Sequence, residues 1–143
     1  MLGTDHHDGV AGILSLDVIG AQNLPTTHRL PNPFTVISYG RRAYRTRWHR
    51  STISPNWGES VQLVVRKGEL EKYLIVLSVY DYDRMGYNQC LGTTNVKVQF
   101  FGEQPEKQCK LALQLQNDNE GQESLLLLKG QFRTIESIET ELW

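Results

Sequence analysis

Two groups of charged residues in this chain have residue types and a spacing that suit binding chemistry. The first is an arginine group that contains His49 and no acidic residue: Arg41, Arg42, Arg45, Arg47 and Arg50. The second is a carboxylate pair, Asp81 and Asp83. A guanidinium group donates two parallel hydrogen bonds to a phosphate, so the arginine group predicts a phosphate-bearing ligand. The alternative is a strand face that water merely solvates.

The other reactive side chains fit no catalytic motif. The histidines at positions 6, 7, 28 and 49 lie in no nucleophile, zinc or phosphate-loop pattern. Cys90 and Cys109 have no zinc-ligand spacing, and their number favours two free thiols over a disulfide scaffold. The sequence therefore predicts a protein that is not an enzyme, with no catalytic residue and no cofactor.

Composition limits where an anionic ligand can be attracted. The chain has 143 residues, of which 39% are hydrophobic and 22% charged, as in one ordinary globular domain. The net charge is −1, so attraction to a polyanion must come from local clustering. A nucleic-acid partner is not expected, because the chain lacks a recognition helix and an RNA-binding aromatic motif.

The apolar segments predict no insertion across a bilayer. The longest apolar run, Leu125 to Leu128, is far shorter than the roughly 20 residues that a spanning helix needs. The first residues carry neither the basic start nor the apolar stretch of a signal peptide. We therefore expect a cytoplasmic protein that associates peripherally with membranes.

The elements that must position these side chains are strands, because apolar residues recur with a period of two. Eight runs with β-strand character are separated by turn signals rich in Gly, Pro and Asn, and only Gly68 to Lys72 indicates a helical turn. The runs cover residues 14–18, 34–39, 43–49, 61–65, 73–80, 93–98, 110–115 and 124–132. The pattern predicts an all-β, eight-stranded antiparallel sandwich.

The ends of the chain are expected to lie outside this sandwich. Residues 1–10 are predicted to be a flexible N-terminal segment and residues 11–133 the folded domain. Residues 134–143 combine Ile135, Ile138 and Leu142 at helix-like spacing with three glutamates. We interpret them as a C-terminal tail or linker.

Several segments, in the same order along the chain, resemble the motifs of C2 domains. Ala21 to Leu24 is similar to the family's first strand exit, and Pro31 to Phe34 stands at its Ser-Asp-Pro-Tyr segment. Ser54 to Glu59 resembles its Asn-Pro-x-Trp-Asn-Glu turn, and Tyr80 to Arg84 its Trp-Asp-Trp-Asp-Arg segment. The resemblance implies a C2 β-sandwich, with the permuted, phospholipase-like (type II) strand order because one strand precedes the first loop.

A closer resemblance is carried by the arginine segment. Gly40 to Arg42, followed by Tyr44 to Arg47, is similar to the C2 domains of fungal-type phosphatidylserine decarboxylases. The catalytic part of such an enzyme is absent from these residues, although the parent protein of such a domain can be an enzyme of that kind.

The resemblance implies a degenerate calcium site. Calcium-binding C2 domains use about five aspartates from two loops, and only Asp81 and Asp83 match. The other acidic positions fall on Thr26, Asn32 and Gln89, so we expect calcium binding to be absent or weak. We hypothesise that Arg29 neutralises one aspartate in place of the metal; the alternative is that both aspartates cap the loop through backbone N–H groups.

The resemblance also implies a lipid site. Arg45 and Arg47 match the family's Lys-x-Lys pair, and their spacing puts both side chains on one strand face. The loop residues expected to face the membrane are Leu30, Pro31, Met85 and Tyr87, unless the loops pack against each other. Trp57 and Trp48 are both expected to be buried.

These inferences predict a non-catalytic membrane-docking module. It binds anionic phospholipid headgroups, such as phosphatidylserine or phosphoinositides, through the arginine-rich strand face and the loop tips, largely without calcium. It is expected to target a larger lipid-metabolising or signalling protein. The alternative is a C2 domain that acts as a protein–protein interaction or intramolecular regulatory module, with a protein partner in place of the membrane.

Overall fold

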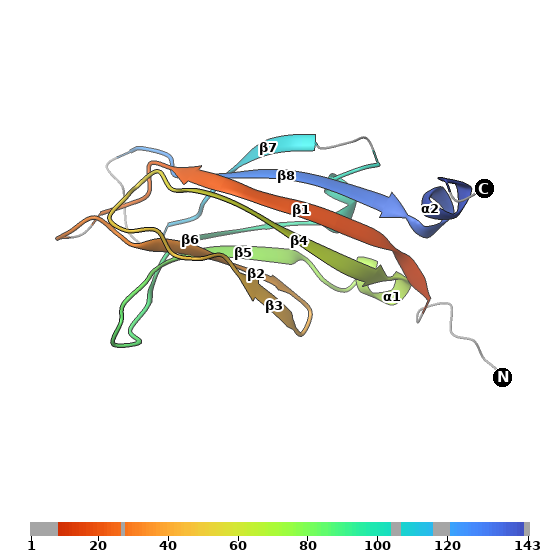
Figure 1. The fold of residues 1–143 in the computed structure, drawn as a ribbon, viewed down its shortest axis with the longest axis horizontal. Coiled ribbons are helices and arrows are strands. Elements are labelled where there is room, and N and C mark those ends of the chain that lie inside the picture. Colours follow the sequence, from red (N-terminus) through yellow and green to blue (C-terminus); the bar gives the residue numbers. More distant parts are fainter. Residues whose placement is uncertain (1–8, 27, 104–106, 116–120, 142–143) are drawn as a thin grey trace.

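Two four-stranded antiparallel sheets pack face to face in this protein (Figure 1). The computed structural model describes residues 9–26, 28–103, 107–115 and 121–141. The first sheet has the order β4–β1–β8–β7, formed by Asn56–Arg66, Val10–Gln22, Leu125–Thr134 and Lys107–Ala112. The second has the order β3–β2–β5–β6, formed by Arg42–Arg45, Pro33–Tyr39, Ile75–Asp81 and Gln89–Val96.

The strands agree with the periodicity of the sequence, with one difference that matters for the site. Each of the eight predicted runs contains or overlaps a strand, which confirms the eight-stranded antiparallel sandwich, although the described chain is mostly β rather than all-β. The expected strand over residues 43–49 ends at Arg45. Thr46 breaks its regular alternation, because its hydroxyl turns back to accept a hydrogen bond of 2.9 Å from the backbone N–H of Thr35.

Short helices complete the described chain. The predicted helical turn is α1, Lys67–Leu70, directly after β4. A 3-10 helix follows β6 at Val98–Phe100. The helix-like spacing of the C-terminal residues forms α2, Ile135–Glu141, which contacts β1 and β8. The expected tail is therefore helical over these residues and packs on the first sheet.

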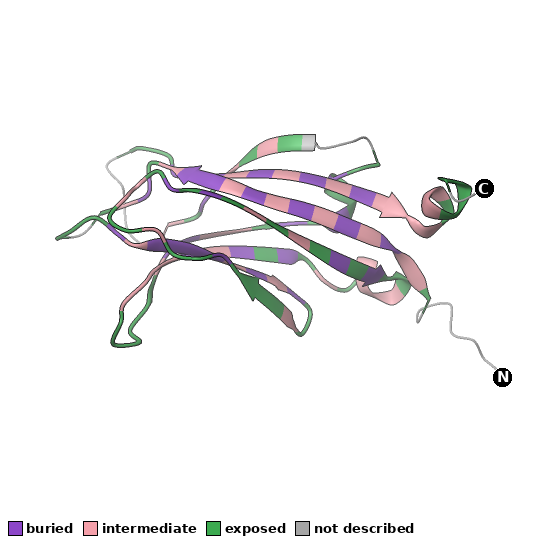
Figure 2. Ribbon diagram, viewed as in Figure 1, coloured by how far each residue is buried: buried purple, intermediate pink, exposed green. Residues whose placement is uncertain are grey.

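The core lies between the two sheets and follows from the alternation of side chains along each strand. In β1 the residues Leu14, Leu16 and Val18 are buried while their neighbours are half-buried, and Figure 2 shows the same banding along β8. Full burial of one such side chain contributes about 1.5–3 kcal/mol. The two facing sets of apolar residues hold the sheets together.

Three loops gather at one end of the sandwich, the left end in Figure 1, opposite α1 and α2. They are the β1–β2, β3–β4 and β5–β6 loops, which we call the loop end. At the opposite end lies the turn between β2 and β3, where Gly40 has a φ of +59°. Residues that are far apart in the sequence therefore become neighbours in space at the loop end.

Two buried aromatic side chains differ in how their polar atoms are satisfied. The indole N–H of Trp57, which is buried as predicted, donates a hydrogen bond of 3.1 Å to the carbonyl oxygen of Pro33. The hydroxyl of Tyr39 is buried with no hydrogen-bond partner in the part of the chain that the structure describes. Burial raises the pKa of Tyr39 to about 12.

This difference predicts opposite results for two phenylalanine substitutions, measured by chemical denaturation. Tyr39→Phe removes a buried hydroxyl without a partner, so stability should stay equal or rise by about 1 kcal/mol. Trp57→Phe removes a hydrogen bond and part of a buried ring, so it should cost about 1–2 kcal/mol. A loss above about 1 kcal/mol for Tyr39→Phe would mean that the hydroxyl is satisfied after all.

Candidate functional site

Asn32 joins the three loops of the loop end through its backbone and side chain. Its backbone N–H donates to Oδ1 of Asp81, and its carbonyl oxygen accepts from the N–H of Tyr82, both at 2.8 Å. Its side-chain Oδ1 accepts from the N–H of Ser51, also at 2.8 Å. The first loop is therefore bonded to the β3–β4 loop on one side and to the β5–β6 loop on the other.

Asp81 is held by a cation from the first loop, as hypothesised from the sequence. Nη2 of Arg29 lies 3.1 Å from Oδ2 of Asp81, and Nη1 of Arg29 donates to the carbonyl oxygen of Leu30 at 2.9 Å. The Arg29 side chain is 41% exposed, so the ion pair contributes at most about 1 kcal/mol. The prediction that Arg29 contacts one of the two aspartates is confirmed.

Asp83 caps its own loop through a backbone N–H group, which is the alternative role that the sequence left open for the two aspartates. Its Oδ1 accepts from the N–H of Met85 and its carbonyl oxygen from the N–H of Gly86, each at 2.8 Å. Its backbone N–H donates to Oδ1 of Asn88 at 2.8 Å. Gly86 has a φ of +89°, which a glycine adopts without strain. These bonds fold the β5–β6 loop into a compact turn.

The donors at this position do not fit a calcium ion. Calcium takes six to eight oxygen ligands, and carboxylate charge sets the affinity. One of the two carboxylates already pairs with Arg29, and one oxygen of the other accepts the Met85 N–H. Within the described residues, no three His, Cys, Asp or Glu side chains lie together so that they could hold a metal ion.

Arg42 is engaged within the protein. Its Nη1 donates to the carbonyl oxygen of Val64 at 2.7 Å, and its Nη2 pairs with Oε1 of Glu69 at 3.2 Å. Its guanidinium also lies 5.3 Å from the centre of the Tyr39 ring. Arg42 thus joins the edge strand of the second sheet to β4 and α1. Both terminal nitrogens of Arg42 therefore already have partners within the protein, which leaves this residue the least suited of the five predicted lipid-binding arginines.

The remaining arginines do not form a single cluster. Arg42 lies opposite Tyr39, at the end of β2. The backbone N–H of His49 donates to the carbonyl oxygen of Pro33, at the start of β2, so Arg50 follows at the loop end. Seven residues of strand span about 20 Å. Arg41 and Arg50 therefore lie toward opposite ends of the sandwich.

Arg45 and Arg47 lie between these extremes. Arg45 is exposed opposite Val36 and its guanidinium lies 4.5 Å from the centre of the Phe34 ring, on the outer face of the second sheet. The backbone N–H of Arg47 donates to Oε2 of Glu59 at 2.8 Å. Sequence analysis found no acidic residue within the arginine group, and it missed this carboxylate because Glu59 comes from a strand of the other sheet.

The apolar side chains at the loop end divide into exposed and buried ones. Met85 and Tyr87 are 74% and 80% exposed on the compact turn, and Leu30 is 47% exposed. Pro31 is buried, and its carbonyl oxygen accepts from the N–H of Thr52 at 2.9 Å. The expectation that Pro31 faces the membrane is therefore wrong, because the residue packs beneath the β3–β4 loop.

Trp48 also differs from expectation, because it is 37% exposed. Its indole ring stacks on the ring of Tyr82, with 4.7 Å between the ring centres and an angle of 4° between the planes. The stack borders a hollow of about 550 Å³ between the β3–β4 and β5–β6 loops. The sequence did not predict this arrangement, because the strand expected over residues 43–49 ends at Arg45 and Trp48 lies beyond it.

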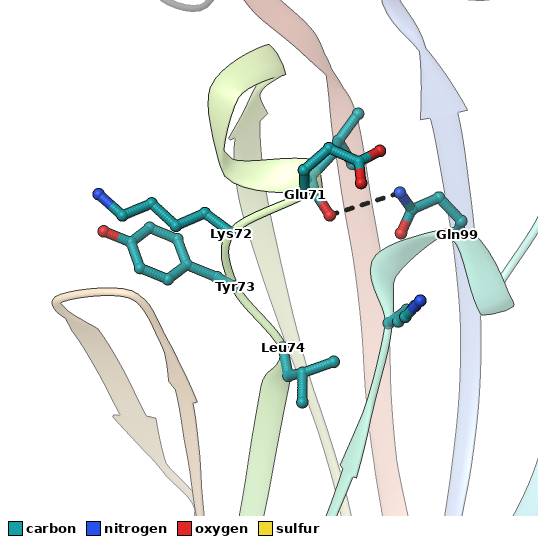
Figure 3. A pocket seen from close by; sticks show the side chains of 7 residues that line it. Glu71, Lys72, Tyr73, Leu74 and Gln99 are labelled. Carbon is teal, nitrogen blue, oxygen red and sulfur yellow. Dashed lines mark hydrogen bonds between the residues drawn. The ribbon is translucent and has the colours of Figure 1, made fainter.

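A second hollow, of about 290 Å³, lies at the opposite end of the sandwich (Figure 3). Glu71, Lys72 and Leu74 line it from the segment before β5, and Gln99 closes it from the 3-10 helix. The side-chain amide of Gln99 donates to the carbonyl oxygen of Leu70 at 3.5 Å. The residues that line this second hollow carry charges of both signs, which indicate no particular ligand. They lie far from the loop end, so substitutions there can serve as controls for substitutions at the loop end.

The described helices include none that is both long and apolar enough to cross a membrane. The chain is similar over part of its length to several much longer proteins. It is 39% identical to human synaptotagmin-5 over 56 residues, which are 39% of this chain and 14% of that protein. It is 30% identical over 92 residues to phosphatidylserine decarboxylase proenzyme 2 of Komagataella phaffii, covering 60% of this chain and 9% of that protein.

The chain thus spans only a small part of the length of the curated relatives that it matches. A phosphatidylserine decarboxylase of Schizosaccharomyces pombe is similar as well, with 27% identity over 94 residues, 62% of this chain and 10% of that protein. These matches confirm the resemblance to fungal phosphatidylserine decarboxylases that the arginine segment indicated.

Solved structures agree with the fold. A C2 domain of plant extended synaptotagmin 1 superposes with a TM-score of 0.76 at 18% identity, covering 88% of this chain and 97% of that one. The calcium-bound pair of C2 domains of extended synaptotagmin 2 gives a TM-score of 0.72 at 18% identity, covering 93% and 51%. Residues 12–113 match the C2 domain family, and the chain therefore belongs to that family.

Proposed function

We propose that this C2 domain is a non-catalytic module that docks on anionic phospholipid membranes without needing calcium. The observation that carries the proposal is the composition of the loop end. Exposed Leu30, Met85 and Tyr87 lie at the same end of the sandwich as Arg50 and Arg84, two arginines that form no ion pair among the described residues. Apolar tips beside cations suit a surface where hydrocarbon lies beneath anionic headgroups.

Two exposed arginines, one on β3 and one just beyond its end, add attraction. Each basic side chain near an anionic leaflet contributes about 1 kcal/mol, so Arg45 and Arg47 together supply about 2 kcal/mol. Burial of an apolar tip such as Met85 contributes up to about 1.5–3 kcal/mol. Neither contribution alone gives tight binding, and their sum corresponds to roughly millimolar to sub-millimolar affinity. The proposed module therefore works best together with other membrane contacts in a longer protein.

Calcium independence is supported by the Arg29–Asp81 ion pair. A calcium ion in the loops of a C2 domain neutralises the aspartates that surround it and bridges the loops. Here Arg29 supplies a positive charge to Asp81, and Asn32 supplies the bridge between loops. We propose that these two residues perform the structural part of the metal's role permanently.

The relatives support a lipid-linked setting for the whole protein. The names of two fungal relatives describe enzymes that act on phosphatidylserine, and we propose that the parent protein is a lipid-metabolising or signalling protein. We assign the domain to residues 11–133, because β7 and β8 complete the first sheet beyond the family match. The first loop follows β1 directly, which supports the permuted strand order.

Calorimetry should detect no calcium binding tighter than the millimolar range, because the site offers one unpaired carboxylate where calcium needs several. The designed contrast is Arg29→Ala/Asn32→Asp, which releases Asp81 and adds a third carboxylate. This variant keeps the acceptor for Ser51, and it should bind calcium measurably more tightly than the natural chain. A micromolar isotherm for the natural chain that disappears in Asp81→Asn would contradict calcium independence.

Replacement of Arg45 and Arg47 by alanine should lower partitioning onto phosphatidylserine vesicles about thirtyfold, since it removes about 2 kcal/mol of attraction. Binding of the natural chain should also weaken as salt increases. Co-sedimentation at two ionic strengths measures both effects. Thermal unfolding of the variant should change little, because both side chains are exposed.

The matched control is Lys72→Ala/Lys97→Ala, which removes the same charge at the opposite end of the sandwich. It should reduce vesicle binding much less than the arginine variant. Equal losses in the two variants would mean that only net charge matters and that the Arg45–Arg47 face is not the contact. No vesicle binding by the natural chain would favour the protein-interaction function instead.

A further inference from the structure

The hollow at the loop end is lined by residues from all three loops, including Arg29, Asn32 and Asp83, whose contacts order these loops. Arg50 and Trp48 come from the β3–β4 loop, and Tyr82, Asp83 and Arg84 from the β5–β6 loop. The hydrogen bonds of Asn32 to both loops fix their separation, and the Trp48–Tyr82 stack joins them directly. The hollow is therefore a preformed feature between two braced loops.

The charges around this hollow are of both signs and are not paired with one another. Arg50 and Arg84 are exposed, and neither guanidinium forms an ion pair with any acidic side chain that the structure describes. One oxygen of Asp83 accepts the N–H of Met85, while the other makes no hydrogen bond within the described chain. Three guanidinium groups, of which that of Arg29 pairs with Asp81, and one carboxylate thus line a hollow of about 550 Å³ that is large enough for a small polar group.

We propose that this hollow binds the headgroup of an aminophospholipid, with the phosphate on Arg50 and Arg84 and the ammonium group on Asp83. The inference rests on the proposed membrane docking and names the lipid that the loop end selects. Phosphatidylserine fits the charges best. Its phosphate matches the two guanidinium groups, its carboxylate keeps the headgroup anionic overall, and its ammonium group matches a carboxylate that a purely anionic ligand would avoid.

The negative charge of Asp83 favours an aminophospholipid headgroup over a polyphosphate headgroup. An inositol phosphate headgroup carries several negative charges and no positive one, so Asp83 would repel it. The aromatic stack also favours the ammonium group, since a cation is attracted to an exposed ring face. Leu30 and Met85 are exposed and directly follow the lining residues Arg29 and Arg84 in the chain. Contact of these two apolar side chains with a bilayer would bring the lipid headgroups close to the hollow.

The test compares phosphatidylserine with phosphatidylglycerol, which has the same net charge but no ammonium group. The natural chain should partition about threefold more strongly onto phosphatidylserine vesicles than onto matched phosphatidylglycerol vesicles, as expected for one exposed ion pair. Asp83→Asn keeps an acceptor for the Met85 N–H and removes the charge. In this variant the preference should fall to about one, with binding to phosphatidylglycerol increased.

The direction of this change separates a headgroup site from general electrostatic attraction. If only surface charge mattered, Asp83→Asn would strengthen binding to both lipids equally, and the proposal would be overturned. Glu71→Gln makes the same charge change at the opposite end of the sandwich and should leave the lipid preference at about threefold. Arg50→Ala/Arg84→Ala should weaken binding to both lipids by about thirtyfold.

A soluble headgroup gives a readout that does not depend on vesicles. Glycerophosphoserine should shift the backbone amide resonances of residues 82–85 in the natural chain and not in Arg50→Ala/Arg84→Ala. Vesicle binding without a phosphatidylserine preference and without these shifts would overturn the headgroup site while leaving membrane docking intact. Loss of vesicle binding in the natural chain, by contrast, would overturn the proposed docking itself.

Discussion

The bonding of Asn32 to two other loops is the constraint on which the loop end depends. Three hydrogen bonds of 2.8 Å connect it to Asp81, Tyr82 and Ser51, so the first loop is fixed between the other two. An aspartate at this position accepts the same side-chain hydrogen bond but adds a charge beside Asp81, which then needs a metal. The amide therefore gives the loops the same connection without creating a requirement for calcium.

The fold was largely predictable from the sequence because burial between two sheets imposes a period of two on every strand. The period predicted eight strands, and the order of turn motifs indicated the family. The site was only partly predictable. Arg29 was expected to contact Asp81 or Asp83, because all three occupy family loop positions, and the structure identifies Asp81 as its partner. The Arg42 side chain pairs with Glu69 and the Arg47 backbone N–H bonds to Glu59. Both glutamates come from elements outside the second sheet, so neighbours in the sequence did not indicate these contacts.

The position of Trp48 shows why the end of a strand is where such predictions fail. Alternation predicts burial only while the backbone stays in the ladder, and β3 ends three residues earlier. Beyond Arg45 the chain follows hydrogen bonds from Thr46 and His49 to β2. The Trp48 ring instead stacks on the ring of Tyr82 at the loop end, and Trp48 is partly exposed there. Functional groups at this end are consequently set by bonds between loops, which the period of a strand does not encode.

A built-in cation changes how a membrane-docking domain of this kind is controlled. Where calcium orders the loops, the ordered state depends on the concentration of the ion. Here the ion pair of Arg29 and the hydrogen bonds of Asn32 are part of the chain, and under the proposed function they order the loops without a signal. Binding then varies with what remains adjustable, namely the lipid composition of the membrane, the ionic strength and the number of linked membrane contacts. Under the proposed function, the domain reads the composition of a membrane rather than a calcium pulse.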